Sequence, residues 1–136
     1  MTSIFSKIIA GEIPSYKIAE NDRFYAFLDV FPLVNGHTLV VPKIEVDKIY
    51  ELNDQDLSGL LQFAQPIARA IEKAFPCKRC GLAVIGLEVP HAHLHLVPIN
   101  TADDLNFTRS KIKPTEDELK NAQHKLLEQL NFYTNQ

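Results

Sequence analysis

The stretch His91-Ala92-His93-Leu94-His95-Leu96-Val97 alternates histidines with apolar residues, and it holds three of the chain's five histidines. Because successive side chains of an extended strand point to opposite faces, the three imidazoles share one face and the apolar side chains share the other. Three neighbouring imidazoles would repel each other if charged, which favours a chemical role over a purely structural one. The stretch therefore predicts a strand with one face in the core and one face that carries chemistry.

Apolar and β-branched segments, bounded by turn signals, predict further strands upstream of this one. The polar residues 20–23 suit a tight turn, so the segments on either side of them form a hairpin. A turn at Asn35-Gly36 leads into another buried strand, which Pro42 ends. The five predicted strands are residues 16–19, 24–28, 37–41, 82–85 and 91–97.

Two segments in the first half of the chain have the three-and-four apolar spacing of a helix. Residues 3–10 form a short helix, and Gly11 suits its C-terminal cap. A longer helix begins at Asn53 or Asp54, either of which can cap it. Pro66 interrupts this helix, but the apolar stripe continues beyond it, so we expect a kink instead of an end.

A third helix is predicted near the C-terminus, after the capping box of residues 114–118, and it extends to about Asn131. Residues 99–113, which precede it, show no clear period. The order of elements predicts the α+β class, with a five-stranded antiparallel sheet that carries its helices on one side.

The composition is that of a globular domain with a full core, since 46% of the 136 residues are hydrophobic and 23% are charged. No apolar run approaches the roughly 18 residues of a membrane span, and the N-terminus lacks the apolar stretch of a secretory signal, so we expect no membrane partner and a cytoplasmic location. The formal net charge of −3 argues against a nucleic-acid partner, because phosphate backbones are held mainly by clustered Lys and Arg.

The two cysteines form the pair Cys77-Lys78-Arg79-Cys80. This spacing occurs in zinc knuckles and redox sites, but a structural zinc ion needs two more ligands, and the chain contains no second pair of this kind. We therefore interpret the two cysteines as free thiols in a turn.

Two chemistries suit histidines aligned on a strand. Neutral imidazoles can bind a divalent metal that activates water, with His37 as a further ligand. Alternatively, one imidazole is itself the nucleophile, and its neighbours donate hydrogen bonds to the developing charge. The loop 86–90 before the triad offers backbone N–H groups to an anion such as a phosphate. Asp29, among apolar neighbours, is either a turn residue or a carboxylate that holds a ribose.

The chain resembles the histidine triad (HIT) superfamily of nucleotide-binding hydrolases, nearest its Hint-like branch, from Met1 to about Asn100. The triad pattern of that family, three histidines alternating with apolar residues, is met by residues 91–97. Supporting stretches are residues 4–9, 11–14, 26–29 and 36–43. The resemblance implies that residues 1–100 are a HIT domain and that the protein is a homodimer in which two sheets join. Residues 101–136, which match nothing in the family, are expected to be a C-terminal segment with a helix in the same compact unit.

The same resemblance implies roles for individual residues. His93 would be the nucleophile that attacks the α-phosphate of an AMP-like purine nucleotide, His95 would donate to the phosphate, and His91 and His37 would complete the imidazole network. Asp29 would hold the ribose. The nucleotide-binding residues would also include Phe5, Ile8, Phe27 and Val30 at the base, and Glu88 and Val89, beside His95, at the phosphate.

Several positions depart from the pattern of the family. Relatives with a structural zinc ion hold it through positions that are Ser3, Ser6 and Glu45 in this chain, so we expect no metal and no cofactor. A Gln before the triad is Leu87, and an Arg after it is Ile99. An Asn near the ribose is Cys80.

Three functions follow from the sequence. The first is a nucleotidyl hydrolase that cleaves a nucleoside phosphoramidate or a related phosphoanhydride through a covalent intermediate on His93. The second is a nucleotide-binding module with little catalysis, motivated by Leu87, Cys80 and Ile99. The third is a metal-dependent hydrolase with the triad histidines and His37 as ligands.

Overall fold

The computed structural model describes residues 2–134, with side chains described for residues 2–131. Met1, the first residue of the predicted HIT domain, and Asn135 and Gln136, the last two of the predicted C-terminal segment, lie outside the described residues. The elements in order are α1 (Ile4–Ile9), β1 (Lys17–Glu20), β2 (Phe24–Leu28), β3 (Thr38–Pro42), the 3-10 turn η1 (Ile49–Glu51), α2 (Asp54–Ala74), β4 (Arg79–Ala83), β5 (Leu94–Ile99), the 3-10 turn η2 (Ala102–Leu105) and α3 (Glu116–Thr134).

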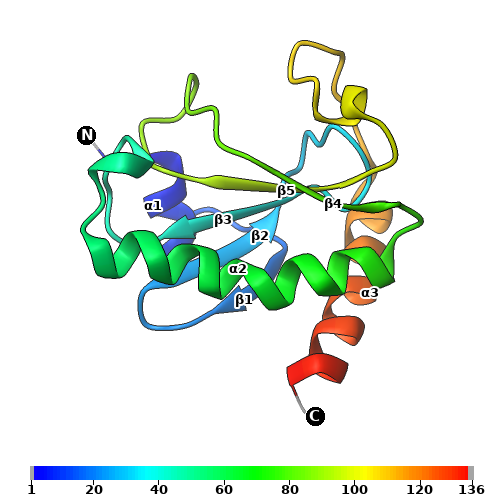
Figure 1. The fold of residues 1–136 in the computed structure, drawn as a ribbon, viewed down its shortest axis with the longest axis horizontal. Coiled ribbons are helices and arrows are strands. Elements are labelled where there is room, and N and C mark those ends of the chain that lie inside the picture. The colour runs from blue at the N-terminus through cyan, green and yellow to red at the C-terminus, as the bar shows by residue number, and fades with distance from the viewer. Residues whose placement is uncertain (1, 135–136) are drawn as a thin grey trace.

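The five strands form one antiparallel sheet in the order β1-β2-β3-β5-β4, which confirms the predicted α+β class (Figure 1). All five strands start and end within about three residues of their predicted limits. The predicted fourth strand, residues 82–85, lies two to three residues too late, because the apolar run suggests it, and the predicted fifth strand begins three residues too early. In the structure β4 begins at Arg79 and ends at Ala83, since pairing with β5 and not hydrophobicity sets its length.

The caps that the sequence predicts are present at all three helices. Ser3 accepts a hydrogen bond from the Ser6 amide at the start of α1, and Gly11 follows this helix with a φ of 81°. Asn53 caps α2 through the Asp56 amide, and the helix runs unbroken past Pro66. Thr115 and Glu118 form the reciprocal capping box of α3.

The prediction that all helices lie on one side of the sheet is wrong for α1. Helices α2 and α3 cover one face, where their apolar side chains share a core with Ala26, Val40 and Leu96. Every residue of β2 and β3 is buried, so the second face also needs cover. Phe5 and Ile8 of α1 supply it by packing on the side chains of β2 and β3 that point the other way.

The two edges of the sheet differ. Gln123 of α3 donates a hydrogen bond to the carbonyl oxygen of Lys17, which covers the backbone of edge strand β1. Strand β4 is the opposite edge, and beside it lies a groove of about 830 Å³ between β4 and α2. Across the described part of the chain, no helix combines the length and apolar character needed to cross a bilayer.

Candidate active site

The three triad histidines lie together on the face of the sheet that α1 covers. Strand β5 starts only at Leu94, because the amides of His91 and Ala92 donate to loop carbonyls instead of to β3. The predicted alternation still holds: Ala92, Leu94 and Leu96 point into the core beneath α2, while the imidazoles of His93 and His95 meet edge to face at 4.9 Å. All three triad histidines and His37 are buried.

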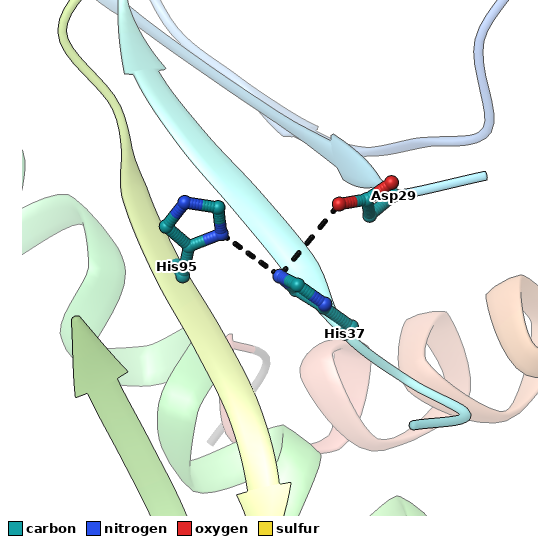
Figure 2. Close-up of side chains that lie close together, drawn as sticks. All are labelled: Asp29, His37 and His95. Atoms are coloured by element: carbon teal, nitrogen blue, oxygen red, sulfur yellow. Dashed lines mark hydrogen bonds and ion pairs between the residues drawn. The ribbon is translucent and has the colours of Figure 1, made fainter. Parts of the chain in front are cut away.

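Hydrogen bonds determine which nitrogen of His37 and His95 carries the proton. The Leu33 amide donates to Nδ1 of His37 at 3.0 Å, so the proton of neutral His37 is on Nε2. That Nε2 lies 2.9 Å from Nδ1 of His95 and donates to it, which leaves the proton of His95 on its Nε2 (Figure 2). The Leu33 amide therefore acts through His37 to place the proton of His95 on Nε2, where it can be donated to a ligand.

His93 has the opposite arrangement. Its Nδ1 donates to the carbonyl oxygen of His91 at 2.7 Å, so Nε2 carries the lone pair. No hydrogen bond from the described residues reaches this Nε2. Because every fully buried side-chain nitrogen and oxygen among those residues has a partner, the Nε2 of His93 is accessible to solvent. The site thus presents one free imidazole lone pair.

His91, whose carbonyl oxygen accepts from His93, is itself held by two hydrogen bonds of its ring. Its ring is completely buried, and Nε2 donates to the carbonyl oxygen of Pro42 at 2.8 Å. Nδ1 then accepts from the hydroxyl of Ser3 at 2.7 Å. Glu45 closes the cluster, since one of its oxygens accepts from both the Ser3 amide and the Ser6 hydroxyl, each at 2.7 Å.

Burial keeps the imidazoles of the site neutral. It lowers the pKa of His37 to about 3 and that of His95 to about 3, with smaller contributions from the charges of neighbouring histidines and Lys111. Burial also lowers the pKa of His93 below its usual value. Near pH 7 the imidazole of His93 is therefore unprotonated and available as a nucleophile.

Asp29 follows β2 directly, and one of its two carboxylate oxygens has the turn role that the sequence left open. Its Oδ1 accepts from the Phe31 amide at 2.9 Å, as in a turn, while Oδ2 lies 3.8 Å from Nε2 of His37 (Figure 2). Burial raises the pKa of this carboxyl, and the hydrogen bond from Phe31 offsets the rise in part. Asp29 therefore lies beside the histidines with one oxygen engaged in the turn.

Neither of two ligand sets in this region fits a metal ion. The ligand atoms of Asp29, His37 and His95 lie within 4.8 Å of one another, but the Nε2 of His37 carries the proton that it donates to His95. The cluster at the start of α1 has two hydroxyls, from Ser3 and Ser6, where a structural zinc site needs ligands, beside the imidazole of His91 and the carboxylate of Glu45. The geometry therefore favours the nucleophilic chemistry over the metal-dependent one.

The apolar residues that the sequence assigned to a base pocket separate into two groups. Phe5, Ile8 and Phe27 pack together, with the ring of Phe5 edge to face on Phe27 at 5.5 Å and on His93 at 5.0 Å. Val89 packs against the same cluster. Val30 is not part of it and is 42% exposed.

Two residues near the histidines were not found from the sequence. The ring of Phe107 lies 4.6 Å from that of His95 and 6.1 Å from that of His37. The ammonium of Lys111 lies 4.0 Å from the carboxylate of Glu88, which is on the loop before the triad. Both belong to residues 99–113, where no periodic signal marks them, because their positions depend on the path of the chain after β5.

Comparison with known proteins supports this description of the fold. The family model described as the HIT domain matches residues 10–102. Over 102 residues the chain is 39% identical to Protein hit of Bacillus subtilis, covering 70% of this chain and 69% of that protein. Over 96 residues it is 36% identical to an adenosine 5'-monophosphoramidase of Saccharomyces cerevisiae, covering 70% of this chain and 61% of that protein.

Solved structures agree. A Zn-bound histidine triad family protein from Mycobacterium smegmatis superposes with a TM-score of 0.84 at 27% identity, covering 99% of this chain and 97% of that one. A Hit-like protein from Bartonella henselae described as involved in cell-cycle regulation gives a TM-score of 0.80 at 29% identity, over 94% and 96% of the two chains. With three alternating histidines that lead into β5, the last of them on the strand itself, and with the family model matched over residues 10–102, the chain belongs to the histidine triad (HIT) family.

Proposed function

We propose that the protein is a nucleotidyl hydrolase that cleaves a nucleoside phosphoramidate, or a related phosphoanhydride, at the α-phosphate. The single observation that carries the proposal is the state of His93, whose Nδ1 is held by the His91 carbonyl while Nε2 presents an accessible lone pair. This arrangement suits a nucleophile, because the imidazole is oriented and unprotonated before the substrate arrives.

In the proposed reaction, Nε2 of His93 attacks the α-phosphorus and forms a nitrogen–phosphorus bond. The bond from phosphorus to the leaving nitrogen breaks, and that nitrogen takes a proton from solvent and departs as the amine. In the second step, water attacks the phosphorus, the bond to His93 breaks, and the proton of the water returns to solvent. The products are the nucleoside monophosphate and the free amine.

The neighbouring residues have complementary proposed roles. His95 donates from Nε2 to a phosphate oxygen, and His37 maintains that donor through its own hydrogen bond. His91 positions His93 through its carbonyl oxygen. Asp29 is proposed to bind the ribose with the oxygen that faces the histidines.

The remaining nucleotide contacts would come from both sides of the triad. Phe5, Ile8 and Phe27 offer the apolar surface for a purine base, with the exposed side chain of Val30 at its margin. The loop that contains Glu88 and Val89 would contribute backbone donors to the phosphate. The names of two yeast relatives, both adenosine 5'-monophosphoramidases, make adenosine phosphoramidate the first substrate to test.

The test is incubation with adenosine phosphoramidate, with chromatography to follow AMP and intact-mass measurement to detect a nucleotidyl adduct. We expect AMP release by the wild-type protein. A protein that binds AMP but releases none from this substrate, and forms no adduct, would instead support the binding module. That second function is favoured by one observation: Leu87, where relatives carry a Gln, is 88% exposed and offers no polar group to a phosphate.

We also propose that the protein is a homodimer in which the sheets of two copies join at β4. This strand is an edge of the sheet with its neighbour on one side only. Beside it, the groove is lined by Leu57, Leu61, Leu82 and Val84, all of them exposed apolar side chains. Unpaired edge strands and apolar patches of this kind are typical of surfaces that a partner covers.

A further inference from the structure

The segment after β5 crosses the histidine site and is fastened on both sides of it. At one end, the ring of Phe107 lies edge to face on the ring of His95. At the other, the amide of Ile112 donates to the carbonyl oxygen of Pro32 at 3.0 Å, three residues beyond Asp29. Figure 1 shows this segment and the loop before β5 projecting from the same side of the sheet. Lys111 reaches from one to the other, toward Glu88.

The charges around the histidines do not suit a phosphate unless a cation joins them. The imidazoles of His37, His93 and His95 are held neutral by burial, and Asp29 is acidic. The phosphate of AMP carries up to two negative charges near pH 7. The charge of Lys111 contributes to lowering the pKa of Asp29, of His37 and of His95, so this ammonium group acts on the site.

We propose that Lys111 is a phosphate-binding residue of this site. In the absence of a nucleotide, its ammonium group pairs with the carboxylate of Glu88. The inference rests on the proposed function, since it concerns the nucleotide bound there. The arrangement of the segment supports it, because Phe107 and Ile112 hold the backbone on either side of Lys111 while its side chain keeps a third of its surface exposed.

The ion pair between Lys111 and Glu88 is weak enough for a phosphate to displace the carboxylate. The two charged groups are 4.0 Å apart, beyond hydrogen-bond distance, and the side chain of Glu88 is 85% exposed. Exposed pairs of this kind contribute little to stability. A phosphate can therefore replace the carboxylate, because it offers more negative charge and several acceptor oxygens at similar reach.

The test compares the affinity of AMP with that of adenosine, which has the same base and ribose and no phosphate. Calorimetric titrations would use the full chain and the variants Lys111→Met, Glu88→Gln and, as the matched control, Lys113→Met, an exposed lysine two positions further on. Lys111→Met is expected to weaken AMP binding about five- to tenfold and to leave adenosine binding unchanged. Glu88→Gln is expected to strengthen AMP binding about two- to threefold, since it removes the competing charge.

The double variant Lys111→Met with Glu88→Gln should bind AMP as Lys111→Met alone does, because Glu88 acts only through Lys111. An equal loss for AMP and adenosine, or no loss for either, would overturn the proposal while leaving the hydrolase in place. If the wild-type protein binds neither compound, the proposed function itself fails. A loss in Lys113→Met as large as that in Lys111→Met would show a general effect of charge and would also overturn the proposal.

Discussion

The hydroxyl of Ser3 donates a hydrogen bond of 2.7 Å to Nδ1 of His91, a residue 88 positions later in the chain. This contact joins the start of α1 to the triad. Through the His91 carbonyl, which accepts from Nδ1 of His93, the N-terminal helix supports the proposed nucleophile from behind. Ser3 is therefore a positioning residue, two hydrogen bonds away from the lone pair of His93.

Ser3→Ala should lower both stability and turnover. It leaves a buried nitrogen of His91 without its donor and removes the cap of α1, for a combined loss of about 2–3 kcal/mol in the free energy of unfolding. Urea denaturation measures this loss. Ser6→Ala is the matched control, because its hydroxyl lies 3.4 Å from the same nitrogen, and it should cost clearly less. Ser3→Thr, which keeps the hydroxyl, should have a kcat close to that of the wild type, because the hydrogen bond to His91 can still form. Equal losses in the two alanine variants would contradict the role of Ser3.

His93→Ala should lose the proposed turnover. The Nε2 of His93 is the proposed attacking atom, so we expect AMP release from adenosine phosphoramidate to fall by at least about 10³-fold while AMP still binds. Rates from chromatography and affinities from calorimetry separate the two effects. His124→Ala, which changes the exposed fifth histidine on α3, is the control and should behave as wild type. Wild-type turnover by His93→Ala would exclude this residue as the nucleophile.

Acid should destabilise the protein through its buried histidines. The pKa of His37 and that of His95 are each lowered to about 3 in the folded state, against about 6.5 when unfolded, so the unfolded chain binds more protons between these values. The free energy of unfolding should therefore decrease as the pH falls from 6.5 toward 3. The raised pKa of Asp29 acts in the opposite direction and offsets part of the decrease.

Urea midpoints at several pH values would measure this dependence. His37→Gln should flatten it by up to about 1.4 kcal/mol per pH unit, the contribution of one proton. His124→Gln, on the protein surface, should leave it unchanged. The same slope in His37→Gln and wild type would show that other groups cause the acid sensitivity.

Removal of metal should not affect the proposed turnover. The cluster of Ser3, Ser6 and Glu45 fits hydrogen bonds better than zinc, and the proton on His37 occupies the position where a metal would have to bind. We expect less than stoichiometric zinc by elemental analysis, and AMP release that is unchanged by EDTA. Stoichiometric zinc together with chelator-sensitive turnover would restore the metal-dependent hydrolase.

Leu61→Lys should dissociate the proposed dimer. Leu61 is an exposed apolar residue of α2 that lines the groove beside β4, so a charge there would be costly to bury in an interface. Sedimentation velocity at micromolar concentration should show a dimeric wild type and a monomeric variant. Ile44→Lys, another exposed apolar residue that lies outside this groove, should remain dimeric. A wild-type protein that sediments as a monomer would contradict the proposal.

The sheet could be predicted in large part because its signals are local. Alternation at the triad, the turn before β3 and the caps at Asn53 and Thr115 each depend on residues close together in the chain. The bounds of β4 could not be read in this way, since they depend on pairing with β5, and the apolar run 82–85 overlaps only the last two residues of this strand. Similarly, nothing within α1 reveals which face of the sheet it covers.

The features of the candidate site likewise separate into those encoded by local sequence and those that depend on tertiary contacts. The sequence by itself determined the family, the class of fold and the identity of the histidines, because residue order and spacing carry that information directly. Only the tertiary structure decided which nitrogen of each imidazole is protonated, since the deciding partners are the Leu33 amide and the carbonyls of Pro42 and His91. It also brought Phe107 and Lys111 to the site. These contacts depend on where the backbone passes after folding, and no periodic pattern encodes that path.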